Sequence, residues 1–180
     1  MKSPKMISEK IVYESDLTKV VLSEIELPDG KIVEWDWVDN SNVVAIVPID
    51  EKGNIYLCKE WRPAWKTEVT QIPAGGCNAQ DEDGRIKQAH NELREEIGMD
   101  AKKLEKLITY YGGGRMNYVI HVYFATGLFP SKKDPDEGEI IEVIKMPFEK
   151  AFDKFIKMGE PTFGSTVIGL LMAKDKLRGN

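Results

Sequence analysis

The sequence contains little cysteine and little histidine. Its 180 residues include only Cys58 and Cys77, and only His90 and His121. Two cysteines are too few for a disulfide framework, and they lack the clustering that a structural zinc site needs. Neither histidine has an acid and a nucleophile in a recognisable arrangement, so we expect both to be structural. Cysteine usage therefore favours a reduced, cytoplasmic setting.

The sequence also lacks a long apolar run and an excess of positive charge. Its start, MKSPKMISEKIVYESD, has no continuous apolar segment of the kind found in signal peptides, and no stretch approaches the length of a membrane span. The net charge of -5 argues against a general attraction to nucleic acid phosphates. We therefore expect neither a membrane nor a long nucleic acid as a partner.

The residues that are present have the composition of a soluble globular protein, with 42% apolar and 31% charged residues. Segments with strand character come first, at 10–13, 18–26 and 32–38. The last two are separated by a turn signal at 27–30, and together the three predict an N-terminal antiparallel hairpin.

The rest of the chain mixes strands with helices. Residues 43–48 and 55–60 predict a second hairpin with a buried strand, and 85–97 is the clearest helix because its apolar residues recur on one face. Further strands are expected at 107–111, 119–125 and 140–146, and further helices at 148–158 and 166–176. This mixture predicts an α/β or α+β sandwich with helices covering the sheet. We expect a hairpin subdomain over 1–40 and a main domain over 41–180.

Three glutamates lie close together on the predicted helix 85–97. At 3.6 residues per turn, Glu92 and Glu96 lie one turn apart on the same face, and Glu95 lies beside them. Like charges at this spacing destabilise an isolated helix, so a cation that neutralises them would explain their grouping. Ligation by oxygen atoms alone suits Mg²⁺, or Mn²⁺ as a substitute.

An acidic helix face is usually a solvated surface, and a bare E-x-x-E-E pattern favours that interpretation. Two features favour a cleft instead. The carboxylates lie beside the apolar face rather than opposite it, and the glycine turn at Gly75 and Gly76 precedes the helix by one loop. The context therefore indicates a metal site.

This segment resembles the Nudix box, in which a glycine, a loop, a glutamate and a helix ending in R-E-U-x-E-E-x-G-U follow one another, U being a bulky apolar residue. The positions that match are Glu92, Leu93, Glu95, Glu96, Gly98 and Met99. Asn91 stands where the family has arginine, Asp83 replaces the first glutamate, and fifteen residues rather than thirteen separate Gly75 from Asn91. In the family the arginine orients the neighbouring carboxylates, so its absence implies lower activity or compensation by Arg85 or Arg94.

The resemblance extends over most of the chain and points to the branch of ADP-ribose pyrophosphatases and nucleoside diphosphate sugar hydrolases. It implies a Nudix α/β/α sandwich with a mixed sheet, preceded by a small N-terminal antiparallel β-domain that commonly exchanges contacts across a homodimer. The sequence E-W-R-P around Arg62 resembles the segment whose arginine contacts the substrate's phosphates. The sequence I-P-A-G is similar to the turn whose alanine carbonyl, here that of Ala74, binds a metal. The acidic segment 136–143 resembles the loop that supplies a general base, here Glu139 or else Glu137.

The resemblance implies Mg²⁺-dependent hydrolysis of the pyrophosphate bond of a nucleoside diphosphate sugar. ADP-ribose, giving AMP and ribose 5-phosphate, is the leading candidate substrate, and GDP-mannose and other sugar nucleotides are further candidates. The ions would bind the diphosphate and activate water, and Arg62 would stabilise phosphate charge. Glu95 counts both as a metal ligand and as a catalytic residue, and the remaining metal ligands are Ala74, Glu92 and Glu96. The loop residues Glu137 and Glu139 are equally compatible with solvated turn positions.

Two alternative functions are compatible with the same residues. A catalytically weak ADP-ribose-binding sensor is supported by Asn91 and opposed by the intact glutamates. Hydrolysis of a nucleoside triphosphate or of a dinucleoside polyphosphate fits the N-terminal hairpin and the late acidic loop less well than a sugar-linked substrate does.

The paired tryptophans Trp35 and Trp37 and the glycine run 112–114 are further candidates for substrate contacts. The tryptophans lie two apart in a strand, on one face, where a base could stack on one of them. A hairpin core or a dimer interface explains them equally well. The glycine run could let a phosphate or a metal approach closely, which makes Gly114 a candidate substrate contact, although a flexible turn is an alternative interpretation of the run. The family has a Pro-Gly pair at about this place, and Gly113 stands where the family has proline.

Overall fold

The structure is a computed structural model that describes residues 2–16, 18–134 and 140–179. The chain divides into two compact units. The first consists of Met1–Asn42 with Tyr110–Val119, and the second of Val43–Thr109 with Ile120–Asn180. The first unit therefore includes a segment, 110–119, that the sequence had assigned to the main domain.

The first unit is a four-stranded sheet in the order β1-β2-β3-β9. Its first three strands run antiparallel, and β9 adds to β3 in parallel. The strands are β1 (Lys5–Glu14), β2 (Lys19–Glu26), β3 (Ile32–Asp39) and β9 (Met116–Asn117). Gly30 closes the β2–β3 turn with a φ of 85°, a left-handed conformation that favours glycine. The predicted N-terminal antiparallel β-domain is confirmed.

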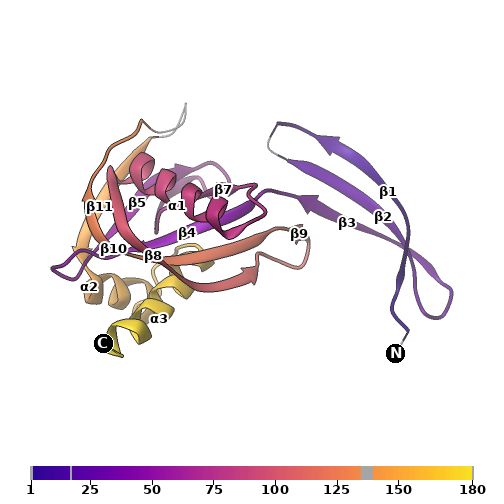
Figure 1. Cartoon of the computed structure of the whole chain (residues 1–180). Coiled ribbons are helices and arrows are strands. Elements are labelled where there is room, and N and C mark those ends of the chain that lie inside the picture. Colours follow the sequence, from indigo (N-terminus) through magenta and orange to yellow (C-terminus); the bar gives the residue numbers. More distant parts are fainter. Residues whose placement is uncertain (1, 17, 135–139, 180) are drawn as a thin grey trace. The chain divides into compact units, whose positions relative to one another are not determined.

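The second unit contains two sheets and the helices that cover them (Figure 1). A mixed sheet has the order β7-β4-β10-β8, with β4 and β10 parallel, and an antiparallel sheet has the order β11-β5-β6. The strands are β4 (Asn42–Pro48), β5 (Asn54–Arg62), β6 (Thr67–Gln71), β7 (Ala74–Cys77), β8 (Met99–Tyr111), β10 (Val119–Pro130) and β11 (Ile141–Pro147). The helices are α1 (Glu82–Glu96), α2 (Phe148–Phe152), the π-helical turn η1 (Asp153–Lys157) and α3 (Gly164–Arg178).

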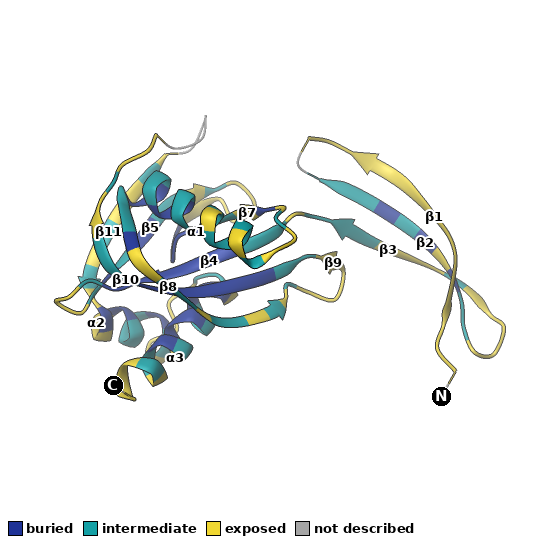
Figure 2. Cartoon of the chain, in the orientation of Figure 1, coloured by how far each residue is buried: buried dark blue, intermediate teal, exposed yellow. Residues whose placement is uncertain are grey.

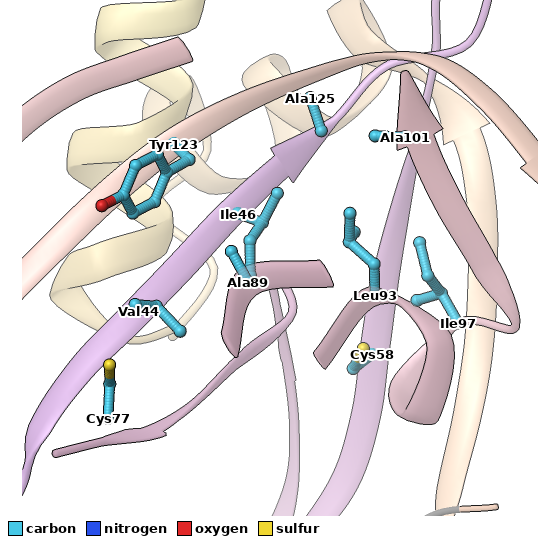
Figure 3. Close-up of a cluster of buried hydrophobic side chains, with 10 residues drawn as sticks. All are labelled: Val44, Ile46, Cys58, Cys77, Ala89, Leu93, Ile97, Ala101, Tyr123 and Ala125. Atoms are coloured by element: carbon cyan, nitrogen blue, oxygen red, sulfur yellow. The ribbon is translucent and has the colours of Figure 1, made fainter. Parts of the chain in front are cut away.

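Side chains that alternate along β4 explain why helices cover both faces of the mixed sheet. Val44 and Ile46 belong to a buried cluster with Ala89 and Leu93 of α1 (Figure 3). Val47 points to the other face, because successive side chains of a strand alternate, and it packs against α3. A strand covered on both faces has to be apolar throughout, and β4 is buried from Val44 to Pro48 (Figure 2). The predicted α/β/α sandwich is confirmed.

Helix α3 approaches the sheet closely at Gly169. A Cβ atom there would lie 2.9 Å from Val47 Cγ2 and 3.1 Å from Ile72 Cδ1, so only glycine allows this contact. The side-chain oxygen of Thr166, one turn earlier, accepts a hydrogen bond of 3.1 Å from the Ile72 backbone N–H. Helix α3 therefore holds the segment that leads into Ala74. Within the described residues, no helix has the length and apolar character needed to cross a membrane.

Candidate active site

Helix α1 begins and ends where local signals place its termini. The Asp81 side chain accepts a hydrogen bond of 2.8 Å from the Gly84 N–H, which caps the N-terminus. Gly98 follows the last turn with a φ of 66°, the usual C-terminal conformation. The residues buried on α1 are Ala89, Glu92, Leu93 and Glu96. Two carboxylates thus share the buried face with apolar side chains, as the sequence predicts.

Glu92 lies against the glycine turn that precedes α1. Its side chain is 8% exposed, and a Cβ atom at position 75 would overlap its carboxylate. A side chain at position 75 would therefore force the Glu92 carboxylate to move from the position it has here. The turn and the helix of the predicted box are therefore in direct contact, through Gly75 and Glu92.

Glu96 is buried against the same turn. It is 6% exposed, and its Oε2 accepts hydrogen bonds from the Ala74 N–H at 2.9 Å and from the Cys58 thiol at 3.4 Å. Burial, together with the negative charge of Glu92, raises the pKa of Glu96 to about 8. Without a cation, this carboxyl group holds a proton at neutral pH. A divalent ion beside it would displace that proton.

Strand β5 places a row of polar side chains beside Glu96. Cys58, Glu60 and Arg62 alternate along the strand and so share one face. The charge of Glu60 contributes to the raised pKa of Glu96. Glu60 also accepts a hydrogen bond of 2.7 Å from the Gln71 side chain and pairs with Arg62. The row therefore runs from the buried carboxylate to a guanidinium group.

Arg62 stands at the exposed end of this row. Its guanidinium lies over the Phe163 ring, 5.4 Å from the centroid, which holds the side chain in place. Its Nε is buried without a hydrogen-bond partner among the described residues. The side chain as a whole is 36% exposed, so N–H groups at the end of the guanidinium can donate to phosphate oxygens.

Glu95 has a different environment from its two neighbours. Its Oε1 accepts a hydrogen bond from Lys133, with which it forms an ion pair. The Lys133 N–H in turn bonds the Arg94 carbonyl at 3.1 Å, which holds the segment after β10 against the end of α1. In the described part of the chain, no three acidic, histidine or cysteine side chains are grouped closely enough to hold a metal ion. The structure brings Glu92 and Glu96 together and turns Glu95 towards Lys133.

The donors at the turn nonetheless fit a hard divalent cation. Glu92 and Glu96 supply carboxylate oxygens, and the cradle at Gly75 would be closed by any side chain there. Oxygen donors of this kind are those that Mg²⁺ and Mn²⁺ prefer.

Each of the two arginines proposed to replace the missing box arginine contacts other side chains and carbonyl groups of α1 and the loop before it. Arg85 donates to Glu82 and to the carbonyl of Gln80. Arg94 donates to the side chain of Asn91 and to the carbonyl of His90. Asp83, which stands where the family has its first glutamate, is exposed in the first turn of α1.

The remaining predicted residues lie elsewhere. Trp35 and Trp37 are on β3, and Gly114 is also in the first unit, so their place relative to the carboxylates stays a prediction. Glu137 and Glu139 lie outside the described residues, and their role as general base also stays a prediction.

Both histidines have partners, as expected for structural residues. His90 bonds Asp100, and His121 lies 3.1 Å from the Thr109 hydroxyl.

Sequence reasoning missed Cys58, Glu60 and Lys133 as parts of the site. The first two alternate with Arg62 along a predicted strand, so the period of two was the signal that pointed to them. Lys133 has no such signal, because its contact with Glu95 joins segments that are 38 residues apart.

The family profile described as NUDIX domain matches residues 39–163 of the chain. The chain belongs to the Nudix family. The match confirms the predicted family, and together with the relatives below it confirms the predicted enzyme class, a Nudix pyrophosphohydrolase.

Three proteins similar to this Nudix chain cover most of its length. The ADP-ribose pyrophosphatase of Bacillus subtilis (strain 168) is 29% identical over 150 residues, which are 82% of this chain and 80% of that protein. The methanol dehydrogenase activator of Bacillus methanolicus is 29% identical over 171 residues, 92% of this chain and 90% of that protein. A crystal structure of an ADP compounds hydrolase superposes with a TM-score of 0.86 at 21% identity, over 99% of this chain and 96% of that one, a likeness of fold alone.

Proposed function

We propose that this Nudix protein hydrolyses the pyrophosphate bond of nucleoside diphosphate sugars, with ADP-ribose as the leading substrate and AMP and ribose 5-phosphate as products. The observation that carries the proposal is the buried pair Glu92 and Glu96, which meets the turn at Ala74 and Gly75 in a chain of this family. The choice of ADP-ribose is supported by the name of the Bacillus subtilis relative. GDP-mannose and other sugar nucleotides are further proposed substrates.

The proposed cofactor is Mg²⁺, with Mn²⁺ as a substitute. Glu92, Glu96 and the Ala74 carbonyl would hold the ion, joined by Glu95 once it leaves Lys133. When bound, such an ion neutralises diphosphate charge and lowers the pKa of an attacking water. The ionised form of Glu96 would then prevail, because a nearby positive charge offsets the effect of burial and of Glu92.

Arg62 is proposed to bind the diphosphate. Its contact with the Phe163 ring and its pairing with Glu60 restrict the guanidinium before substrate arrives, which lowers the entropy lost on binding. A carboxylate of the late loop, Glu139 or else Glu137, is proposed to take the proton from the attacking water.

Trp35 is the better candidate of the two tryptophans for stacking on the base. Trp37 donates from its indole Nε1 to the Ser23 hydroxyl at 2.8 Å, and Ser23 donates to Glu9 at 3.1 Å. The polar edge of Trp37 is therefore used inside the sheet, whereas Trp35 is 56% exposed. An exposed aromatic face is free to stack on a base.

A homodimer formed through the first unit is part of the proposal. Every residue of β1 is exposed, and its larger apolar side chains are Met6, Ile7, Ile11, Val12 and Tyr13. A row of exposed apolar residues on a strand favours contact with another protein surface. Light scattering on the purified protein would test the homodimer, since a monomer mass at micromolar concentration contradicts it.

The cytoplasmic location also stays a prediction.

A panel of nucleotide sugars tests the activity. The protein is incubated with Mg²⁺ and ADP-ribose, GDP-mannose or UDP-glucose, and release of nucleoside monophosphate is measured. We expect AMP from ADP-ribose at the highest rate, and none in the presence of a chelator. Turnover of nucleoside triphosphates but not of sugar nucleotides would contradict the proposed substrate class.

The second candidate function is a binding module with little catalysis. Asn91 in place of the box arginine favours it, and one relative is named as an activator of another enzyme. Calorimetry with ADP-ribose separates the two candidates. Binding without turnover in Mg²⁺ supports a sensor, and turnover supports the hydrolase.

A further inference from the structure

Three polar side chains follow one another along α1 and end at Glu92. Arg94 donates to Asn91 Oδ1, Asn91 Nδ2 donates to Gln88 Oε1 at 3.5 Å, and Gln88 Nε2 donates to Glu92 Oε1 at 2.6 Å. Their positions differ by three or four residues, which is the spacing of neighbours on a helix surface. The last of these hydrogen bonds is short because its acceptor is charged.

The guanidinium at one end determines the direction of every hydrogen bond in this chain of contacts. Arginine has donors and no acceptor, so Asn91 has to present its oxygen to Arg94. The Asn91 amide nitrogen is then left to donate to the Gln88 oxygen, and the Gln88 nitrogen is left to donate to Glu92. A reversed Gln88 would place its carbonyl oxygen against a carboxylate oxygen, which is repulsive.

We propose that Arg94, Asn91 and Gln88 form a relay that positions Glu92 for metal binding. The proposal rests on the role of Glu92 in the proposed function. Gln88 holds Oε1 by a hydrogen bond, and the same oxygen lies closest to Gly75, where the absence of a side chain makes room for it.

An amide has one advantage over a cation at this position. Gln88 is neutral and leaves the negative charge of Glu92 available to a divalent ion, whereas a guanidinium in contact would offset that charge. Asn91 accordingly contributes to the site, because its oxygen accepts from Arg94 and its amide nitrogen is then left to donate to Gln88. Gln88, Asn91 and Arg94 are positioning residues, since each acts through Glu92.

Mn²⁺ binding to the protein without substrate tests the relay by isothermal titration calorimetry. Gln88→Met removes the donor while keeping the length of the side chain. Asn91→Asp still accepts from Arg94 but has no donor for Gln88, so the glutamine loses the contact that orients it. We expect each variant to bind Mn²⁺ about tenfold more weakly, as for other residues that orient a metal ligand. The control Gln80→Met changes an exposed glutamine whose side chain donates to the carbonyl of Asn78 in the loop before α1.

A double variant and steady-state kinetics complete the test. If the three residues act in series, Gln88→Met with Asn91→Asp weakens Mn²⁺ binding no more than Gln88→Met does. In hydrolysis we expect a higher Mg²⁺ concentration for half-maximal rate, with kcat at saturating Mg²⁺ much less changed. A purely structural role would instead change the thermal unfolding temperature and leave the Mg²⁺ dependence as it is.

The outcomes separate this proposal from the proposed function. Failure of the unmodified protein to bind Mn²⁺ would overturn the metal site, and the relay with it. If the unmodified protein binds Mn²⁺ and the Gln88→Met and Asn91→Asp variants bind it with the same affinity, the relay alone is overturned. Additive losses in the double variant would also overturn it.

Discussion

Glu92 and Glu96 on one side of α1 and Glu95 on the adjoining side are identical side chains in different environments. The first two are nine-tenths buried against the backbone of the turn at Ala74 and Gly75. The Glu95 side chain is also largely buried, at 11% exposed, but it forms an ion pair with Lys133, whose side chain is half exposed. An E-x-x-E-E pattern does not therefore describe three equivalent ligands. Two carboxylates are fixed by the fold, and the third is held by a cation that a metal ion would have to displace.

The difference follows from how each group is compensated. Burial of a carboxylate is costly unless hydrogen bonds or a cation compensate it, and the raised pKa of Glu96 reflects that cost. Glu95 already has its cation. Metal binding should accordingly offset the cost of burying Glu92 and Glu96, and the metal should compete with Lys133 for Glu95.

The largest effect is expected for Glu96→Gln. The substitution keeps the shape of the side chain and removes a charge that the proposed metal needs, so hydrolysis should fall by about a thousandfold, the equivalent of several kcal/mol of metal stabilisation. The rate with ADP-ribose and Mg²⁺ measures the loss, with Glu149→Gln, at an exposed position on α2, as the control. Equal rates in Glu96→Gln and the unmodified protein would remove Glu96 from the site.

A smaller loss is expected for Gly75→Ala. The new methyl group would overlap the Glu92 carboxylate and push it out of the cradle, which should weaken Mn²⁺ binding by about ten- to a hundredfold. The matched control is Gly164→Ala, where a Cβ atom meets nothing within 4 Å. Calorimetry on both variants gives the comparison. Should the two glycine variants bind Mn²⁺ alike, Glu92 would not need the cradle.

Lys133→Met should have a small effect in the opposite direction. It frees Glu95 from its ion pair. The lysine end of this pair is half exposed and therefore screened by solvent, so the pair is worth about 1 kcal/mol and Mn²⁺ binding should become tighter by about fivefold. The control is Lys59→Met, which breaks surface pairs with Glu68 and Glu142 on the other sheet. Weaker metal binding in Lys133→Met would show that Lys133 supports the site rather than competing with it.

The sequence predicted helix α1 closely but missed strands β6 and β7 and the first part of β8. The helix is marked by apolar spacing and by Gly98, although it starts at Glu82 rather than at residue 85 because Asp81 supplies the cap. Strand β7 contains two glycines, so its sequence predicted a turn. Its strand conformation comes from pairing with β4, which the local sequence does not show. The charged start of β8 hid residues 99–106, whereas the end of the strand was predicted at 107–111. Local patterns report propensity, whereas these strands depend on partners distant in sequence.

The same division applies to the site. The carboxylates and the turn were predictable because family spacing and helix period both apply within one segment. The contacts of Lys133 with Glu95 and of Cys58 with Glu96 were not, because they join segments far apart in the chain. The environment that separates Glu95 from Glu96 is therefore a property of the fold and not of the motif.

The pH dependence of stability provides the subtlest test of the buried pair. The pKa of Glu96 is about 8 in the folded protein and ordinarily 4.5, so between these values the folded state holds a proton that the unfolded state has lost. The stabilisation from this proton is complete below pH 4.5 and is lost as the pH rises through 8. In a chelator, the midpoint of thermal unfolding should fall by several degrees from pH 5 to pH 8 relative to Glu96→Gln, which has no such proton.

Comparison with Glu96→Gln cancels the contributions that both proteins share. The pKa of His121 is lowered by burial, which makes stability rise with pH near 6, and this occurs in both proteins. Asp50 and Glu82 have lowered pKa values, so they act in the acid range. Mg²⁺ added at pH 8 should raise the midpoint of the unmodified protein and leave Glu96→Gln nearly unchanged, because the ion takes the place of the proton. Parallel pH profiles of the two proteins in chelator would mean that Glu96 is ionised in the folded state, and the contrast with Glu95 would then rest on geometry alone.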